Sequence, residues 1–219
     1  MKVRLVQKNI SDLDIRSHLE AAQSAQVELI CFGELGASGC LYTAREVPKL
    51  EHWLNLLGDY SFGVMLGVPV VEPEGRRNAY LYVLGRGHRL YRKINLFPGM
   101  NEPSVYQPGT TLELWETGLG PTGVTICYDL RFPDLYSSLA KKGAKTILVP
   151  AAWPRVRIGD WKQLLAQRAR ENHVRMIGIN AVGSDATNEF GGSTTVVEPD
   201  GKIRLQGDET HPMSIDFEL

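Results

Sequence analysis

Apolar segments of strand length recur along the whole chain, and single amphipathic stretches separate some of them. Residues 3–7 form the first such segment, and residues 27–34 form a second that is too short for a helix. Between them, Ser11 and Asp14 resemble a capping box, and an apolar stripe predicts one helix. A strand, a helix and a second strand in this order predict an α/β fold.

The rest of the chain continues the pattern, with strands that also come in hairpin-like pairs. Further strands are expected at residues 62–71, 79–85, 88–96, 111–116, 123–129, 145–153, 174–182, 191–199, 201–206 and 214–219. Helices are expected around residues 44–57, over residues 132–144, and after Asp160, which is placed to cap a helix. Single helices together with hairpins predict sheets that mix parallel and antiparallel strands.

The composition is that of an ordinary globular protein. A chain of 219 residues with 43% hydrophobic and 22% charged residues can bury a proper core, and we expect one domain over residues 1–219. Lys and Arg total 24 against 25 Asp and Glu, a formal net charge of −1, so bulk charge would hold neither nucleic acid nor a membrane. The basic residues Arg76, Arg77, Arg86, Arg89, Arg92 and Lys93, or Arg155 with Arg157, are then expected to form a solvated surface.

The three cysteines, Cys31, Cys40 and Cys127, are an odd number, and their spacing matches neither a disulfide framework nor a zinc site. We therefore expect no metal and a reducing, cytoplasmic location. Residues 1–9 are alternating and polar, and no stretch approaches the roughly 18 apolar residues that a membrane span needs.

Cys127 ends an apolar strand and is followed by a tight connection to a helix, which is the sequence context of a nucleophile elbow. A sulfur near a helix N-terminus would have a lowered pKa, and backbone N–H groups there could hold an oxyanion. The alternative is a buried cysteine that only packs, which is common for an unpaired cysteine.

Two charged residues are candidates for the same chemistry. Glu34 follows the strand at residues 27–34, where a partly desolvated carboxylate suits a general base; a helix cap or a loop salt bridge is the alternative. Alternation in residues 88–96 directs Lys93 to the same face as Tyr91, where its ammonium could stabilise an oxyanion. The alternative for Lys93 is a solvated lysine at a strand edge.

Together these residues resemble the nitrilase superfamily of carbon–nitrogen hydrolases, in which a strand-end Glu, a Lys and a strand-to-helix Cys follow one another in this order. The resemblance covers nearly the whole chain. It rests on Gln7, FGE (32–34), YRKINLFP (91–98), Glu102 followed by QPG (107–109), ICYDLRFPDL (126–135), AAWP (151–154), ARENH (169–173) and GGS (191–193).

The resemblance implies a four-layer α-β-β-α sandwich with two mixed central sheets, in which Glu34, Lys93 and Cys127 converge. It also implies hydrolysis of a non-peptide C–N bond, usually an amide, through a cysteine thioester. Glu34 would accept the thiol proton, while Lys93 and the backbone N–H of Tyr128 hold the oxyanion. Glu102 matches a second glutamate that positions Lys93, and the chemistry requires neither metal nor cofactor.

The segment CYDLRFP, residues 127–133, is similar to the branch that contains ω-amidase and deaminated glutathione amidase, so a small carboxylate-bearing amide is the expected substrate. Arg131 occupies a position where related carbamoyl amidohydrolases hold a substrate carboxylate. An ion pair with Asp129 or Asp134 is the alternative role for Arg131. Trp153 would either wall the pocket or belong only to the core.

Other functions stay open on the same residues. The triad would also serve an N-carbamoyl amidohydrolase or a nitrilase, and the scaffold could carry a non-catalytic binding protein. A papain-like hydrolase would need a histidine base, and no histidine here lies in such a motif. Gly33 stands where the superfamily usually has proline. The family expectation for partners is a homodimer or a higher homo-oligomer.

Overall fold

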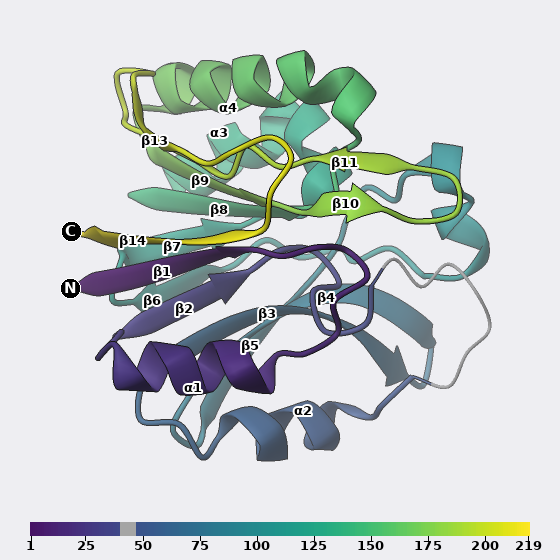
Figure 1. Cartoon of the computed structure of the whole chain (residues 1–219). Helices are drawn as coiled ribbons and strands as arrows, with labels where there is room; N and C mark the ends of the chain where they lie inside the picture. The colour runs from purple at the N-terminus through teal and green to yellow at the C-terminus, as the bar shows by residue number, and fades with distance from the viewer. Residues whose placement is uncertain (40–46) are drawn as a thin grey trace.

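Two six-stranded mixed sheets lie face to face, and a pair of helices covers the outer surface of each (Figure 1). The arrangement comes from a computed structural model that describes residues 1–39 and 47–219. The expected α-β-β-α sandwich with mixed sheets is confirmed. Cys40 and the first residues of the helix expected around 44–57 lie outside the described residues.

The first sheet has the strand order β14-β1-β2-β3-β4-β5, with parallel pairs only between β1, β2 and β3. Its strands are β1 (Lys2–Gln7), β2 (Leu29–Phe32), β3 (Gly63–Glu72), β4 (Gly75–Leu84), β5 (Gly87–Arg92) and β14 (Met213–Glu218). Helices α1 (Arg16–Ser24) and α2 (Leu50–Leu57) cover it. Leu19 and Trp53 are among the apolar side chains that these helices bury against the sheet.

The second sheet has the order β13-β12-β9-β8-β7-β6, with β7, β8 and β9 parallel. Its strands are β6 (Leu114–Thr117), β7 (Gly120–Val124), β8 (Thr146–Ala151), β9 (Arg175–Asn180), β12 (Thr195–Val197) and β13 (Ile203–Gln206). Helices α3 (Pro133–Lys141) and α4 (Ile158–Asn172) cover it. The strands β10 (Val182–Ser184) and β11 (Glu189–Gly191) form a separate hairpin.

The alternation of side chains along β4 explains how the sheets face each other. Tyr80 and Tyr82 belong to the apolar cluster between the sheets, where the ring of Tyr82 stacks on Trp115 of the second sheet at 6.3 Å between centroids. Ala79 and Leu81 point the other way, into the cluster beneath α1 and α2. Residues of this strand with even numbers therefore face the inter-sheet space.

Two helix starts differ from the sequence prediction. The capping box at Ser11 and Asp14 does not form, because α1 begins only at Arg16; Asp14 instead accepts a hydrogen bond from the backbone N–H of Ser17 at 3.2 Å. Asp160 does not cap α4 but lies in its first turn, because the helix already begins at Ile158. The carboxylate of Asp160 is thereby free to pair with a side chain outside the helix.

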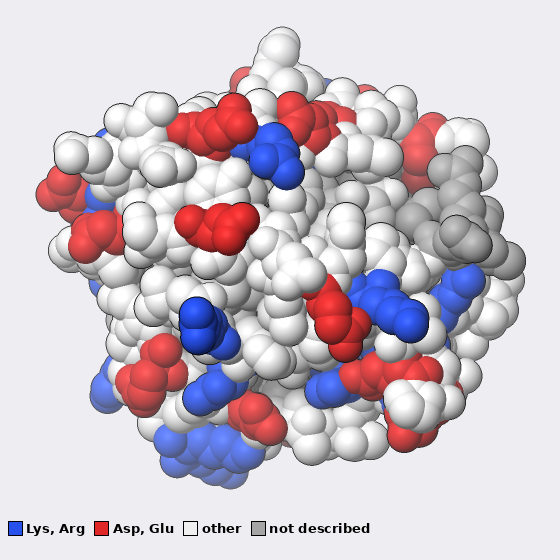
Figure 2. Space-filling view, turned by 90° about the horizontal axis from the view of Figure 1, so that it is seen from below, with Lys and Arg blue, Asp and Glu red and all other residues white. Residues whose placement is uncertain are grey.

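Charges on the surface are paired locally. Figure 2 shows basic and acidic side chains interspersed on the face that looks down from α1 and α2. Arg77 pairs with Glu72 at 3.1 Å, Arg92 pairs with the same carboxylate, and Arg155 pairs with Glu189 at 2.6 Å. These arginine clusters are thus neutralised by nearby acids. Within the described ranges, no helix has both the length and the apolar character needed to cross a membrane.

Candidate active site

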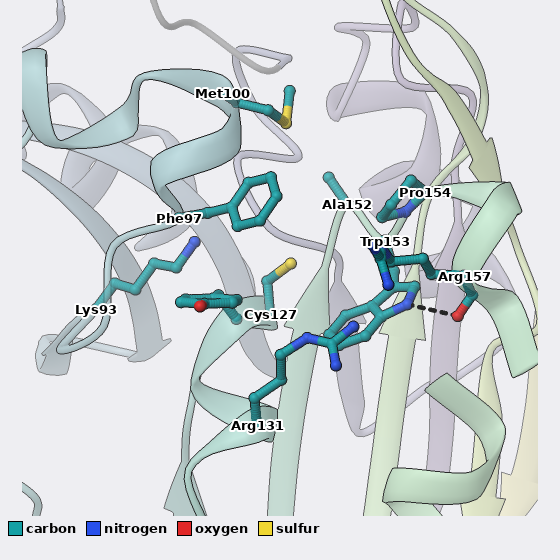
Figure 3. Close-up of a pocket in the computed structure, with 10 residues that line it drawn as sticks. Lys93, Phe97, Met100, Cys127, Arg131, Ala152, Trp153, Pro154 and Arg157 are labelled. Carbon is teal, nitrogen blue, oxygen red and sulfur yellow. Dashed lines mark hydrogen bonds between the residues drawn. The ribbon is translucent and has the colours of Figure 1, made fainter. Parts of the chain in front are cut away.

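Three chain segments that leave their strands at one edge of the sandwich bring the predicted residues together. Glu34 follows β2, Lys93 follows β5, and Cys127 follows β7. A cavity of about 340 Å³ opens there, and Figure 3 shows Cys127 between Lys93 on one side and Trp153 on the other. It is lined by Lys93, Phe97, Met100, Cys127, Tyr128, Arg131, Ala152, Trp153, Pro154 and Arg157. Glu34 and Glu102 are buried against Lys93 rather than exposed in this lining.

Lys93 is the centre of a buried charge cluster. Its Nζ lies 2.8 Å from Oε1 of Glu34 and 2.8 Å from Oε2 of Glu102, and all three side chains are almost fully buried. Burial alone would lower the pKa of Lys93, but the two carboxylates outweigh it and raise that pKa well above its ordinary value. Lys93 is therefore a cation at neutral pH, and the alternative of a solvated strand-edge lysine is wrong.

Both glutamates are also held by the backbone. Oε2 of Glu34 accepts a hydrogen bond from the backbone N–H of Ala152 at 3.0 Å, which joins the first sheet to the end of β8 in the second. Glu102 accepts one from the N–H of Phe97 at 2.6 Å. Burial raises the pKa of Glu102, while Lys93 acts to lower it. The carboxylates are thus fixed in place by groups that cannot rotate away.

Asn78 is a residue of this cluster that the sequence analysis missed. Its Nδ2 donates to Glu34 at 2.8 Å and to Glu102 at 2.7 Å, and it is 1% exposed. The expected strand begins at Ala79, whereas β4 begins at Gly75, so Asn78 lies just outside the expected strand. A polar residue on the same alternate face as Tyr80 was the signal that would have found it.

Cys127 has the backbone of a strained turn. Its φ of 46° lies in the left-handed region. β7 ends at Val124, three residues before Cys127, whereas the expected strand covers residues 123–129. Burial, followed by the charge of Glu34, raises the pKa of the thiol well above its ordinary value, and Lys93 opposes this only in part. The expected lowering by a helix N-terminus is wrong, because the residue opens a short 3₁₀ turn and α3 begins only at Pro133.

Asp129 holds the turn that carries Cys127. Its carboxylate accepts hydrogen bonds from the backbone N–H and side chain of Asn95 at 2.8 and 2.9 Å, from the hydroxyl of Tyr91 at 2.9 Å, and from the N–H of Ile126 at 2.9 Å. These contacts tie the segment after β5 to the segment after β7. Because they occupy both oxygens of Asp129, this residue is not the partner of Arg131.

Arg131 forms an ion pair, but with a different acid from the two that the sequence suggested. Its Nη2 lies 2.9 Å from Oδ2 of Asp160 in α4, and its guanidinium lies 5.0 Å from the ring centroid of Trp153. Arg157 reaches the same Asp160 at 3.7 Å. Trp153 both lines the cavity and packs on Trp161, so the two roles considered for it coexist.

Metal ligation has no support in the described parts of the chain. Residues 1–39 and 47–219 contain no group of three or more His, Cys, Asp or Glu side chains arranged to hold a metal ion. The described cysteines, Cys31 and Cys127, are both free thiols. The cavity lining brings a thiol, an ammonium and two guanidinium groups together, and two carboxylates and one amide lie buried behind the ammonium. Together these groups suit acid–base and nucleophilic chemistry.

The sequence profile of the carbon–nitrogen hydrolase family matches residues 5–215. The match covers nearly the whole α-β-β-α sandwich, and the chain is a member of the carbon–nitrogen hydrolase family of enzymes. The resemblance to the nitrilase superfamily is thereby confirmed.

The chain is similar to several named proteins and solved structures. The chain is 29% identical to a probable nitrilase of Schizosaccharomyces pombe over 95% of this chain and 81% of that protein. It is 29% identical to an omega-amidase of Yersinia enterocolitica over 100% of this chain and 90% of that one. A match of 36% identity to the 2-oxoglutaramate amidase of Bacillus subtilis covers 53% of this chain and 45% of that protein. An amidase from Nesterenkonia sp. AN1 has the same fold, with a TM-score of 0.88 at 23% identity over 100% of this chain and 92% of that chain.

Proposed function

We propose that the protein hydrolyses a small amide that carries a carboxylate, through a thioester on Cys127, and releases ammonia. The observation that carries the proposal is the Lys93 ammonium, clamped between Glu34 and Glu102, at the wall of the cavity that Cys127 also lines. Relatives named omega-amidase and 2-oxoglutaramate amidase support the amide as the substrate class. The volume of about 340 Å³ suits a small substrate, since ligand pockets span about 300–1,000 Å³.

Acylation begins with transfer of the thiol proton of Cys127 to Glu34. A base is required because burial keeps the pKa of the thiol high, so that little thiolate exists before substrate binds. The sulfur attacks the amide carbon, and Lys93 together with the backbone N–H of Tyr128 stabilises the oxyanion. Glu34 then returns the proton to the nitrogen, the C–N bond breaks, and ammonia leaves.

Deacylation uses the same carboxylate. Glu34 accepts a proton from a water molecule, whose oxygen attacks the thioester carbon. The C–S bond breaks, the proton returns to the sulfur of Cys127, and a carboxylic acid is released. Glu102 keeps Lys93 oriented through both steps, because its carboxylate binds the ammonium at 2.8 and 3.1 Å.

The substrate carboxylate binds near Arg131. Arg131 and Arg157 share the single carboxylate of Asp160, which leaves one positive charge in excess at this part of the lining. A planar guanidinium has donors for a second acid beyond the one contacted by Asp160. Trp153 provides an apolar wall beneath the guanidinium of Arg131.

The test is ammonia release from a panel of small amides. It contains ω-amides of 2-oxo dicarboxylic acids, deaminated glutathione, amino-acid amides and N-carbamoyl amino acids, with simple nitriles as a further group. Cys127→Ala is the control for any release that does not need the thiol. Arg131→Gln is the variant for the carboxylate, and we expect a rise in KM of about tenfold or more for carboxylate-bearing amides but not for neutral ones.

Each result of this panel has a consequence. Release from a carboxylate-bearing amide that Cys127→Ala abolishes supports the proposal and identifies the substrate class. Release only from N-carbamoyl compounds or nitriles replaces the amide with that class. Ammonia release at the wild-type rate in Cys127→Ala would overturn the thioester mechanism.

A further inference from the structure

The amide of Asn78 completes a closed ring of hydrogen bonds around the two glutamates. Nδ2 of Asn78 contacts Oε1 of Glu34 at 2.8 Å and Oε1 of Glu102 at 2.7 Å. Nζ of Lys93 contacts the same two oxygens, at 2.8 and 3.1 Å. Two donors thus alternate with two acceptors, and each carboxylate oxygen is held from both sides.

The charges in this ring do not balance without help. Two carboxylates face one ammonium in a site where all three side chains are buried, so one negative charge is in excess. Two acids that share a buried site cannot both stay ionised unless donors stabilise the charged forms; otherwise one of them takes up a proton. Asn78 supplies two such donors and carries no charge of its own.

The other end of the Asn78 amide shows that these contacts matter. Its Oδ1 is buried and has no hydrogen-bond partner, which is unfavourable for a polar atom. Turning the amide over would not help this oxygen, because it would then face two carboxylates, which repel it. An apolar side chain of the same size would avoid the unpaired oxygen but would provide no donor. Asn78 therefore donates two hydrogen bonds to the carboxylates, although its own Oδ1 is left without a partner.

We propose that Asn78 is a positioning residue that keeps Glu34 ionised and directed at the cavity, so that Glu34 can accept the thiol proton of Cys127. The inference rests on the proposed function for the role of Glu34 as the base. It adds a specific requirement, namely two N–H donors at position 78. A residue that only filled space there would be replaceable by leucine.

The test measures the reactivity of Cys127 rather than turnover. Methyl methanethiosulfonate is a small, neutral probe without a C–N bond; the sulfur of Cys127 attacks it, a methyl disulfide forms, methanesulfinate leaves, and the thiol proton passes to Glu34. The rate is followed by mass spectrometry of the Cys127 peptide between about pH 5 and about pH 9. In the wild type we expect the rate to fall towards acidic pH, because attack by the thiol needs an ionised base.

In Asn78→Leu the acidic limb of this profile should move to higher pH by about 1–2 units, since two hydrogen bonds to charged groups are lost. At a pH on the wild-type limb, the rate should drop by about tenfold or more. Asn78→Ser is the second variant, because it keeps one donor in a smaller side chain. The acidic limb of its pH profile should lie between those of the wild type and Asn78→Leu.

Tyr80→Phe is the matched control. Tyr80 lies on the same face of β4, and its hydroxyl donates to the backbone oxygen of Phe32 at 2.8 Å, so the variant loses a buried hydrogen bond without touching a carboxylate. It should lower the melting temperature yet keep the wild-type pH profile. A shift of the profile in Asn78→Leu but not in Tyr80→Phe supports the proposal.

An unshifted profile in either folded Asn78 variant overturns it. The outcome is independent of the substrate, because the probe is not an amide. If the wild type releases no ammonia from the panel while the Asn78 variants shift the profile, the role of Asn78 stands and the amidase proposal falls. If ammonia is released and the profile does not shift, the amidase proposal stands and the proposed role of Asn78 falls.

Discussion

Cys127 has both a strained backbone and a thiol with a raised pKa, and a role in catalysis would explain the two together. Its backbone has a φ of 46°, a conformation that costs a non-glycine residue about 1–3 kcal/mol, and its thiol has a raised pKa because it is buried beside Glu34. A cysteine that only packed would need neither the strained turn nor the neighbouring charge. Because it lines the cavity and lies close to a carboxylate, it has the environment of a nucleophile that is activated by a base.

Replacement of this sulfur should separate activity from stability. We expect Cys127→Ala to lower ammonia release by at least about a thousandfold, because the proposed acyl intermediate forms on the sulfur of Cys127. The melting temperature should change little, since alanine is no worse than cysteine at this φ. Cys31→Ala is the matched control: it removes the other described buried thiol, lowers stability and keeps the turnover. Turnover by the Cys127 variant would contradict the mechanism.

The charge of Lys93 predicts how stability depends on alkaline pH. Its pKa in the folded protein lies well above the ordinary value of 10.5, so its stabilising contribution is complete below about pH 10.5 and is lost as the pH rises through the folded value. At neutral pH, Lys93→Met should unfold about 3–5 kcal/mol more easily, because two buried carboxylates lose their cation. This difference should shrink above about pH 10.5 in urea titrations. A difference that stayed constant to alkaline pH would show that the charge does not stabilise the fold.

At the scale of elements, β3 determines where Glu34 lies. Gly67 of β3 passes so close to the turn after β2 that an added Cβ would lie 2.4 Å from the backbone oxygen of Gly33 and 2.4 Å from the nitrogen of Leu35. The same atom would lie 2.8 Å from the carbonyl carbon of Glu34. The glycine is therefore needed for the close approach of two backbones, and the residue that it crowds, Glu34, is the proposed base.

Gly67→Ala should push this turn away and misplace Glu34. We expect a loss of about 1–3 kcal/mol in unfolding free energy and a fall of about a hundredfold in kcat/KM, since small displacements at a reacting group are costly. Gly159→Ala is the matched control, because Gly159 is an exposed helix residue with nothing within 4 Å of an added Cβ. That variant should keep both stability and activity within about 1 kcal/mol and about twofold. Equal effects of the two substitutions would refute the role of Gly67.

The residues of the candidate site differ in how far the sequence alone could locate them. Glu34 and Cys127 were identifiable because each comes at the end of an apolar segment, and strand ends can be located from local pattern. Lys93 was identifiable from the alternation within residues 88–96, which directs it to the same face as Tyr91. The partner of Arg131 could not be predicted, because Asp160 is 29 residues away and reaches Arg131 only through the packing of α4. Asn78 was missed for a similar reason: its role depends on two carboxylates that lie 44 and 24 residues away.

At the scale of the whole molecule, the candidate site exists only where the two sheets meet. Glu34 and Lys93 come from segments of the first sheet, and Cys127 and Ala152 come from segments of the second. The hydrogen bond between Glu34 and the N–H of Ala152, at 3.0 Å, spans the two. Gly33 also fits this contact, because an added Cβ would lie 3.2 Å from the backbone oxygen of Ala151. Neither sheet alone can hold a base next to the nucleophile.

This arrangement predicts that the two sheets unfold as one cooperative unit and that activity is lost in the same transition. Trp53→Phe makes the experiment selective. Trp53 lies on α2 and its Nε1 has no partner, so the change is mild. The remaining tryptophans lie in the second half of the sandwich: Trp115 in β6, Trp153 just after β8, and Trp161 in α4. In urea, their fluorescence then reports the second sheet, while the reaction of Cys31 with a thiol reagent reports the first.

The midpoints of fluorescence, Cys31 labelling and ammonia release should coincide within error, because burial between the sheets stabilises both at once. Labelling of Cys31 at lower urea than the fluorescence change would mean that the first sheet opens while the second stays folded. Activity would then be lost with the first sheet, since Glu34 and Lys93 depart with it while Cys127 stays on the folded half. Coincident midpoints with an early loss of activity would instead locate the weak point in the turns around the cavity, which are held by Asp129 and Asp160 rather than by the inter-sheet core.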